Sequence, residues 1–275
     1  MEKNFDADVV IGFGDEWNRF DQESLKDSEA ILIFNKYFSI FPWEILNKNS
    51  VGFDLGCGSG RWAKFVAPKV GQLYCIDPSS AIDIAEKKLA NFKNCIFQNL
   101  SVDNMNIENN SMDFGYSLGV LHHIPDTEKG IKSCVDKLKT GAPFLIYLYY
   151  KFDNKPFWYK RIWYISELFR KFISRLPLTL RYYFSQILAI FIYYPFSRIA
   201  RILEKIGFDV INFPLSSYRS YSFYTLRTDS LDRFGTQLEK RFTKHEISEM
   251  MKNSGLINIS FNSQDPFWCA IGYKK

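Results

Sequence analysis

The stretch VGFDLGCGSG, residues 51–60, constrains the fold of this chain more than any other. Its first half is an apolar run of β-strand type that contains one carboxylate, and glycines then occupy every second position. Glycine adopts backbone angles that other residues avoid and leaves room for a ligand to touch the main chain. Residues 61–66 continue as the start of a helix, whose first N–H groups can hold a polar or anionic group. A strand, a tight turn and a helix in this order predict a small-molecule binding loop.

Strand and helix patterns alternate from this stretch to about residue 150. Short apolar runs predict strands at 51–55, 73–76, 95–98, 112–117 and 142–148, with helices at about 60–67, 80–91 and 127–138. Near the end of the chain, Thr243 can cap a helix at 243–253, and strands are expected at 257–261 and 268–273. This alternation predicts an α/β fold with a mostly parallel sheet and helices on both faces.

Four segments are expected. Residues 1–48 form an N-terminal helical lid, in which a folded loop with Trp17 and Phe20 precedes a helix at about 24–41. This lid either covers the sheet edge or closes over a ligand. Residues 49–150 form the α/β core, residues 151–235 a helical and aromatic insertion, and residues 236–275 the last helix and the closing strands. Within the insertion, amphipathic helices are expected to be broken at Pro177 and Pro195, and residues 207–235 to be irregular.

The positive charge of the chain is concentrated in the insertion. The formal net charge is +5, and residues 151–206 carry 11 Lys/Arg against 3 Asp/Glu. The longest uncharged run, 182–197, has 16 residues, whereas a membrane-spanning helix needs about 20. Residues 157–206 are therefore a candidate for peripheral membrane contact or for a phosphate-bearing partner, with a solvated helix face as the alternative.

The cysteines indicate a reducing compartment. There are five, an odd number without CxxC spacing, and most lie in apolar runs. Such thiols are typically reduced and buried. The first six residues are polar and do not resemble a signal peptide. We expect a cytoplasmic protein, with the inner membrane face as the alternative location, and leave monomer and homodimer open.

The spacing of the loop glycines limits the ligand. A dinucleotide-binding fingerprint, G-x-G-x-x-G, would place its third glycine at position 61, where this chain has Arg61. A nicotinamide oxidoreductase is therefore disfavoured. Asp54, just ahead of the glycines, suits a ligand with a cationic amino group. Asp77 ends the second strand, where a carboxylate can accept the hydroxyl groups of a ribose.

The segment MDFGYSLGVLHHIPD, residues 112–126, makes the interpretation specific. Together with the glycine loop and Asp77, it resembles class I S-adenosylmethionine-dependent methyltransferases, and within them the ubiquinone- and menaquinone-biosynthesis type. The resemblance covers residues 50–150 well and residues 243–275 in the order of their elements. It implies a Rossmann-like seven-stranded sheet with an antiparallel last strand, and an insertion after the fifth strand.

The resemblance also implies the cofactor, S-adenosylmethionine, its product S-adenosylhomocysteine, and the residues that bind them. Asp54, Gly56, Cys57, Gly58 and Gly60 would hold the methionine part. The ribose would lie against Asp77 and Pro78, the adenine against Val102 and Asp103, and the sulfonium beside Leu118 and Gly119. The family often has Asp at the position of Ser101, so Asp103 alone would accept from the adenine amino group.

Two histidines are candidates for catalysis. Methyl transfer to oxygen requires removal of a proton, and His122 and His123 follow the fourth strand at its cleft end. The alternative is that one of them packs against the cofactor. A zinc site is disfavoured because no further His or Cys has suitable spacing.

The acceptor should be bound by aromatic and basic side chains. These candidates are Trp17, Tyr147, Tyr149, Tyr150, Arg219, Tyr221, Tyr224 and Arg227. Such a set suits a polyhydroxylated or anionic molecule, although the two arginines could instead pair with Asp229 and Asp232. The sequence thus predicts methylation of a small molecule, first of an oxygen of a sugar or sugar nucleotide in a surface-glycan or natural-product pathway.

Features of the sequence also bear on functions other than methylation of a sugar. The apolar, basic insertion favours a lipid or prenyl-phenol acceptor as the second choice. No nucleic-acid partner is expected, because base-methylating enzymes typically carry Asn/Asp-Pro-Pro-aromatic where this chain has Ser117-Leu118-Gly119-Val120. A non-catalytic binding protein with the same fold is a further alternative.

Overall fold

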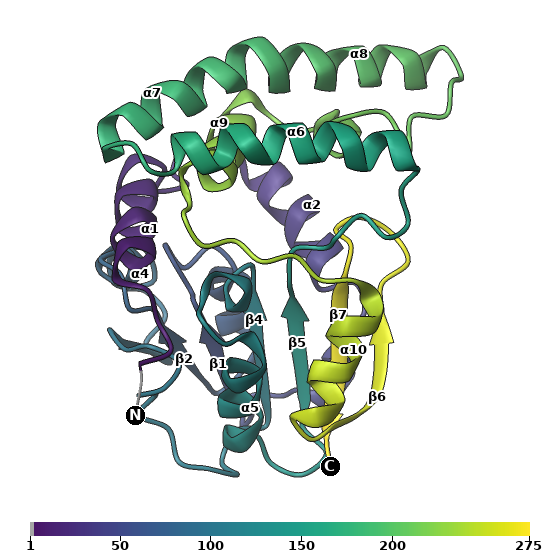
Figure 1. The fold of residues 1–275 in the computed structure, drawn as a ribbon. Coiled ribbons are helices and arrows are strands. Elements are labelled where there is room, and N and C mark those ends of the chain that lie inside the picture. Colours follow the sequence, from purple (N-terminus) through teal and green to yellow (C-terminus); the bar gives the residue numbers. More distant parts are fainter. Residues whose placement is uncertain (1–2) are drawn as a thin grey trace. The chain divides into compact units, whose positions relative to one another are not determined.

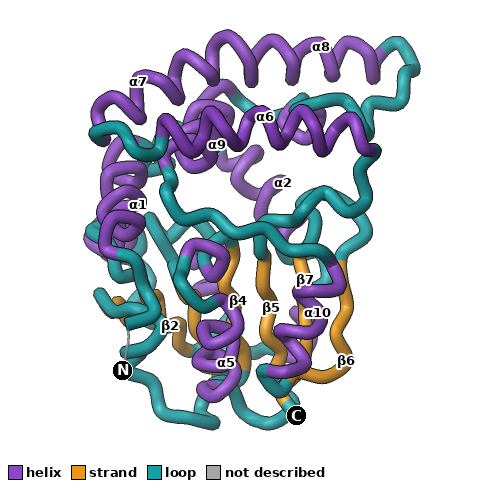
Figure 2. The backbone as a smooth tube through the Cα atoms, viewed as in Figure 1, coloured by secondary structure: helices purple, strands orange, loops and turns teal. Residues whose placement is uncertain are grey.

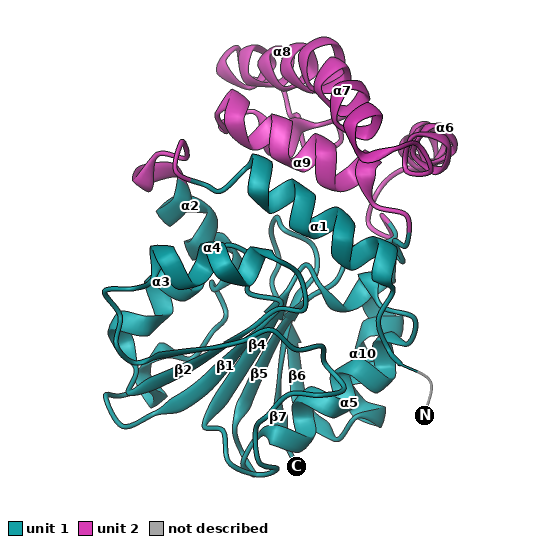
Figure 3. Cartoon of the chain, turned by 90° about the vertical axis from the view of Figure 1, so that its left-hand side faces the viewer, with its two compact units in different colours: residues 1–22, 30–151, 238–275 teal, residues 23–29, 152–237 magenta. Residues whose placement is uncertain are grey.

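The structure is a computed structural model that describes residues 3–275. The chain divides into two compact units, which are described separately here (Figure 3). Unit 1 contains residues 1–22, 30–151 and 238–275, and unit 2 contains residues 23–29 and 152–237.

Unit 1 is built on a seven-stranded sheet (Figure 1). Its strands are β1 (Val51–Leu55), β2 (Gln72–Ile76), β3 (Cys95–Gln98), β4 (Phe114–Leu118), β5 (Pro143–Tyr147), β6 (Leu256–Phe261) and β7 (Cys269–Lys274). They lie in the order β3-β2-β1-β4-β5-β7-β6. All neighbouring pairs are parallel except those that β7 makes with β5 and β6. The predicted mostly parallel sheet with an antiparallel last strand is confirmed.

The helices of unit 1 lie around this sheet, with α3 and α4 on one face and α5 and α10 on the other (Figure 3). They are α1 (Ala7–Arg19), α2 (Asp27–Tyr37), which begins in unit 2, α3 (Ala63–Val66), α4 (Ala81–Lys88), α5 (Thr127–Lys137) and α10 (Lys244–Asn253). Because both faces are covered, the central strands β1, β4 and β5 are mostly apolar and are buried along almost their whole length. Phe53, Phe114 and Phe144, on β1, β4 and β5, are fully enclosed.

The N-terminal segment differs from the expected loop, because residues 7–19 form helix α1. The Asp6 carboxylate caps it by accepting from the backbone N–H groups of Asp8 and Val9. Gly14 lies where α1 packs on the start of α4, and a Cβ there would approach Ser80 Oγ to 2.8 Å. The glycine therefore serves a close helix contact rather than a turn.

Unit 2 is helical (Figure 2). It contains α6 (Phe157–Ile173), α7 (Leu178–Leu188), α8 (Tyr194–Lys205) and α9 (Phe223–Gly235). Helix α9 packs against α6 and α7, and Ile173, Tyr193, Leu226 and Phe234 form a separate small core.

Two expectations for unit 2 were wrong. Residues 223–235 are helical instead of irregular, and Ser222 caps this helix by accepting from Thr225 N–H. Pro195 does not break the preceding helix, because a π-helical turn, Ala189–Tyr193, joins α7 to α8. Pro195 lies in the first turn of α8. The N–H group that proline lacks is not needed for hydrogen bonding at that position.

Candidate active site

The glycine loop after β1 is fixed by the neighbouring strand. The backbone N–H groups of Gly56 and Cys57 both donate to the carbonyl oxygen of Ile76, at 2.7 and 3.1 Å. Gly56, Gly58 and Gly60 have φ values of +75°, +52° and +76°, angles that favour glycine. A Cβ on Gly56 would also lie 2.2 Å from Val120 Cγ2. The sequence therefore needs glycine here both for the turn and for the contact.

Asp54 is a buried acid at the end of β1. Its side chain is enclosed, and Oδ2 has no hydrogen-bond partner in the described part of the chain. Burial raises the pKa of this carboxyl well above its ordinary value; the nearby Tyr116 hydroxyl opposes the rise and Asp77 adds to it. A buried acceptor of this kind is costly unless a partner satisfies it. The cationic amino group of a methionine moiety would be such a partner, so the site fits the methionine end of the predicted cofactor.

Asp77 lies at the carboxyl end of β2 and already holds the loop. Its Oδ2 accepts from Gly58 N–H at 2.9 Å, and its Oδ1 accepts from the N–H and the hydroxyl of Ser79 at 2.9 and 2.6 Å. A carboxylate has about four acceptor positions. Binding both ribose hydroxyl groups would therefore require one of these three donors to move away.

The segment predicted to flank the adenine follows β3. Val102 and Ser101 are buried, and Ser101 Oγ has no hydrogen-bond partner among residues 3–275. Asp103 accepts from the backbone N–H of Asn4 at 2.5 Å and lies 3.8 Å from Lys129 Nζ. The Asn4 contact ties the start of the chain to this edge of the sheet, which the sequence did not predict.

The end of β4 leaves the backbone accessible. Gly119 has a φ of +82°, and a Cβ built on it would have no atom within 4 Å. Its N–H donates to Tyr147 O at 3.0 Å, which holds the turn beside β5. Open space next to a constrained backbone suits a ligand that passes close to the main chain, as predicted for Leu118 and Gly119.

His122 and His123 lie together in a short helical turn after β4. Their rings are 3.9 Å apart, and the ring of His122 also stacks on Tyr149 at 3.9 Å. Both nitrogens of His122 lack hydrogen-bond partners in the described residues. Burial lowers the pKa of His122 well below its ordinary value, and His123 and Arg241 lower it further. The imidazole is therefore neutral at pH 7 and a weaker base than a solvated histidine.

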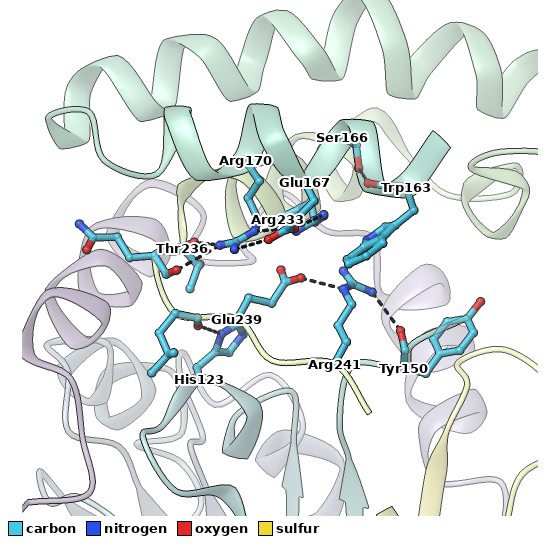
Figure 4. Close-up of polar contacts among 12 residues, drawn as sticks. His123, Tyr150, Trp163, Ser166, Glu167, Arg170, Arg233, Thr236, Glu239 and Arg241 are labelled. Atoms are coloured by element: carbon cyan, nitrogen blue, oxygen red, sulfur yellow. Dashed lines mark hydrogen bonds and ion pairs between the residues drawn. The ribbon is translucent and has the colours of Figure 1, made fainter. Parts of the chain in front are cut away.

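A charged segment that the sequence analysis missed lies against this pair (Figure 4). Leu238 O contacts His123 Nδ1 at 2.7 Å, and Lys240 N–H donates to His122 O at 3.0 Å. Arg241 donates to Glu239 at 2.8 Å and lies 5.0 Å from the centre of the Tyr149 ring.

Glu239 and Arg241 are separated in sequence from the histidines by more than 100 residues. Only their position just before the Thr243 capping box of α10 could have indicated a structured segment. Together they place a buried ion pair beside the histidines.

The aromatic acceptor candidates of unit 1 fall into three places. The indole of Trp17, on α1, packs on Gly58, where a Cβ would approach Trp17 Cε2 to 2.9 Å. Tyr147 and Tyr149 are 5.8 Å apart, and Tyr149 contacts both histidines. Tyr150 packs on Phe267 and Trp268 instead.

The remaining acceptor candidates belong to unit 2 and have partners within it. Arg219 pairs with Glu204 at 2.8 Å, and Arg227 donates to Gln186 and to the Tyr182 hydroxyl at 2.6 and 3.0 Å. Tyr221 packs on the unit 2 core, and Tyr224 O accepts from the Thr228 hydroxyl within α9. Their part in acceptor binding stays a prediction.

Comparison with known proteins identifies a domain in part of the chain. Residues 53–146 match the family model described as a methyltransferase domain. No curated protein sequence matches the chain. The chain is similar to a putative sarcosine dimethylglycine methyltransferase from Galdieria sulphuraria, with 26% identity over 46% of this chain and 50% of that one, at a TM-score of 0.40.

Two other solved structures cover most of this chain. One is a putative methyltransferase from Haloferax volcanii in complex with the Trm112 activator: 12% identity, 92% of this chain, 96% of that chain, TM-score 0.50. The other is phosphoethanolamine N-methyltransferase 2 from Haemonchus contortus, in complex with phosphomonomethylethanolamine and S-adenosylhomocysteine: 16% identity, 94% of this chain, 47% of that chain, TM-score 0.50. The chain spans about half the length of the Galdieria and Haemonchus proteins. The structural likenesses show the fold, and the predicted methyltransferase domain with S-adenosylmethionine as its cofactor is confirmed.

Proposed function

We propose that this chain, whose core is a class I S-adenosylmethionine-dependent methyltransferase domain, transfers the methyl group to an oxygen of a small-molecule acceptor. The observation that carries the proposal is Asp54, a buried carboxylate whose Oδ2 has no partner among residues 3–275, directly ahead of a glycine loop. When bound, S-adenosylmethionine supplies an electrophilic methyl group on a sulfonium sulfur.

The residues of the chain would bind, align and accept a proton. Asp54 and the glycine loop would hold the methionine end, and Asp77 the ribose. As the acceptor oxygen forms its bond to carbon, the carbon–sulfur bond breaks and its electron pair stays on sulfur. The acceptor proton would pass to His122 or His123. The unpaired ring nitrogens of His122 support it as the base, while its lowered pKa disfavours lasting protonation, so it would have to pass the proton on.

Two acceptor classes are proposed, in order. The first is a sugar or sugar nucleotide, supported by the density of Tyr and Arg in residues 218–229. Arg219 and Arg227 would have to exchange their present partners for an anionic acceptor. The second is a lipid or prenyl phenol, supported by the exposed apolar side chains of unit 2.

The test has two stages. Calorimetry with S-adenosylhomocysteine and with NAD should show binding of the first alone. A panel of sugar nucleotides, phenols and lipids is then screened for release of S-adenosylhomocysteine, first with the wild type. Replacement of His122 by Ala should lower turnover roughly 100-fold or more if it is the base. Full turnover of both His122→Ala and His123→Ala variants would remove the base assignment, and absence of S-adenosylhomocysteine binding would remove the proposal.

A further inference from the structure

Most of the large apolar side chains that are exposed in the described residues belong to unit 2. Of the 28 such side chains that are exposed in the described residues, 22 lie between Phe157 and Ile211. On α6 they recur at spacings of three and four, as Trp158, Ile162, Ile165, Phe169 and Phe172, each 48–64% exposed. This spacing aligns them along one side of the helix. Contiguous apolar surface of this extent marks an interaction site.

The long helix of α7 and α8 (Figure 1) exposes large apolar side chains and buries mostly polar or small ones. Its buried positions follow at intervals of four and then three: Arg181, Ser185, Ala189, Tyr193, Ser197 and Ala200. Between them, Ile187, Phe191 and Tyr194 are exposed. A surface helix in water normally has the opposite pattern. Small residues inside and apolar residues outside are typical of helices whose outer face meets lipid.

The polar groups on the inner side are satisfied within unit 2. The Ser185 hydroxyl donates to Tyr182 O at 2.7 Å, and the Ser230 hydroxyl of α9 donates to Ser185 O at 2.8 Å. The Ser197 hydroxyl donates to Tyr194 O at 2.9 Å. The apolar exposure is therefore not the result of an inverted or unpacked helix, because the inner side already has its contacts.

Exposed cations border these apolar side chains. They are Lys160, Arg161 and Lys171 on α6, Arg175 after it, and Arg201 and Lys205 on α8. Between residues 157 and 206 the one exposed acid is Glu204, and it pairs with Arg219. Apolar side chains flanked by Lys and Arg are the composition of helices that lie in the headgroup region of anionic membranes.

We propose that helices α6, α7 and α8 of unit 2 form a docking face for an anionic lipid bilayer, with their axes along the membrane surface. A second copy of the chain is disfavoured, because two such faces would bring like charges together. The helix Leu178–Lys205 is long and apolar enough to span a membrane by length and composition. However, its uncharged run 182–197 has 16 residues, flanked by Arg181 and Arg198, whereas spanning needs about 20 apolar residues.

The test is co-flotation of the full chain with vesicles and needs no turnover, so it is independent of the proposed function. The protein should float with phosphatidylcholine vesicles that contain one third phosphatidylglycerol, and not with phosphatidylcholine alone. High salt should release it. Replacement of Lys160 and Lys171 by Gln should weaken binding roughly fivefold for each cation removed. The matched control, Lys87→Gln with Lys93→Gln on unit 1, should bind as the wild type does.

Substitutions of exposed apolar residues test the depth of contact. Ile165→Asp with Phe169→Asp should abolish flotation, whereas Ile257→Asp, at another exposed isoleucine, on β6, should not change it. Circular dichroism checks that these variants fold. A conservative substitution gives a second test. Brominated lipids should quench the tryptophan fluorescence of the wild type more than that of Trp158→Phe.

Three results would overturn the proposal. The first is flotation that does not depend on anionic lipid or on the α6 side chains. The second is a dimer in light scattering that the Ile165→Asp, Phe169→Asp pair converts to a monomer. The third is resistance of the bound protein to high salt and alkaline extraction, which would indicate a spanning helix.

Discussion

Two buried groups in unit 1, Asp54 and His122, have pKa values shifted in opposite directions by the same cause. Burial raises the pKa of the Asp54 carboxyl and lowers that of the His122 imidazole, so enclosure favours the neutral form of each. Each also has a polar atom without a partner in the described residues. Groups of this kind cost stability, and their presence near a glycine loop indicates that they serve ligand binding or chemistry.

Asp54 should make cofactor affinity depend on pH. A cationic amino group favours the ionised carboxylate, so binding of S-adenosylhomocysteine to a protonated Asp54 releases a proton. Affinity should therefore rise with pH, by up to about tenfold per pH unit, until the raised pKa of the free protein is passed. Asp54→Asn should lose roughly 10- to 100-fold in affinity and should show no such slope. Calorimetry across pH 5.5–8.5 measures both, and an unchanged slope in the variant would refute the assignment.

His122 should make the fold sensitive to acid. Its pKa is lowered in the folded state, so the unfolded chain binds more protons once the pH falls below the ordinary value of about 6.5. The stability present above pH 6.5 should therefore decline as the pH falls, by at most about 1.4 kcal/mol per pH unit from this group. Urea unfolding of the wild type and of His122→Phe at several pH values isolates the contribution. Parallel curves for the two proteins would show that His122 is not responsible.

At the scale of elements, an ion-pair cluster fastens α6 to α9 in unit 2 (Figure 4). Glu167 pairs with Arg170 at 2.5 Å and with Arg233 at 2.9 Å. Arg170 also donates to the carbonyl oxygens of Thr236 and Gln237, at 2.6 and 3.2 Å. Burial opposes ionisation of Glu167, but hydrogen bonds from Arg170 and Arg233 outweigh it and lower its pKa to about 2.

Loss of the Glu167 charge should loosen unit 2. Glu167→Gln leaves two neighbouring guanidinium groups without their carboxylate. We expect it to lower the free energy of unfolding by about 2 kcal/mol, less than for a fully enclosed pair because water still reaches Glu167. In the wild type this contribution is present above pH 4.5 and is lost as the pH falls toward 2. Glu204→Gln, an exposed pair in the same unit, is the control and should cost far less.

Elements with a regular apolar pattern were predictable from the sequence. Strands β1 and β3 have the predicted bounds, and the others differ by one or two residues. Helix α9 was not predicted, because the many Tyr and Arg residues of 218–229 were interpreted as part of an irregular segment. Its Ser222 cap and the apolar residues Leu226, Leu231 and Phe234, which the helix buries, were nevertheless present.

Other features depend on contacts between distant residues and could not be predicted. The glycine loop and Asp77 were identified from local spacing, since one strand and its turn define them. The Asn4 contact with Asp103 and the approach of Arg241 to Tyr149 join parts of the chain about 100 residues apart. No local pattern encodes such pairs, because tertiary packing alone brings them together.

At the scale of the whole molecule, cofactor binding and the helical insertion are assigned to different units. The large core around Phe53, Leu121 and Phe144 lies within unit 1, and the small core around Leu226 lies within unit 2. Every residue proposed to contact the cofactor belongs to unit 1. Each unit thus has its own apolar core, and cofactor binding should not require unit 2.

Excision of most of unit 2 tests this division. Lys151 N–H donates to Phe242 O at 2.9 Å. Residue 238 precedes Phe242 by four residues, which span about 14 Å at most when extended. Residues 151 and 238 are therefore close in space. A Gly/Ser linker of about eight residues can join them in place of residues 152–237.

We expect the shortened chain to keep its affinity for S-adenosylhomocysteine within about threefold. Turnover of the acceptor should fall by roughly 100-fold or more, because the residues proposed to recognise the acceptor are removed. Calorimetry and the S-adenosylhomocysteine release assay give the two values. Retained turnover would show that the insertion does not select the acceptor, and loss of cofactor binding by a folded variant would show that unit 1 is not self-sufficient.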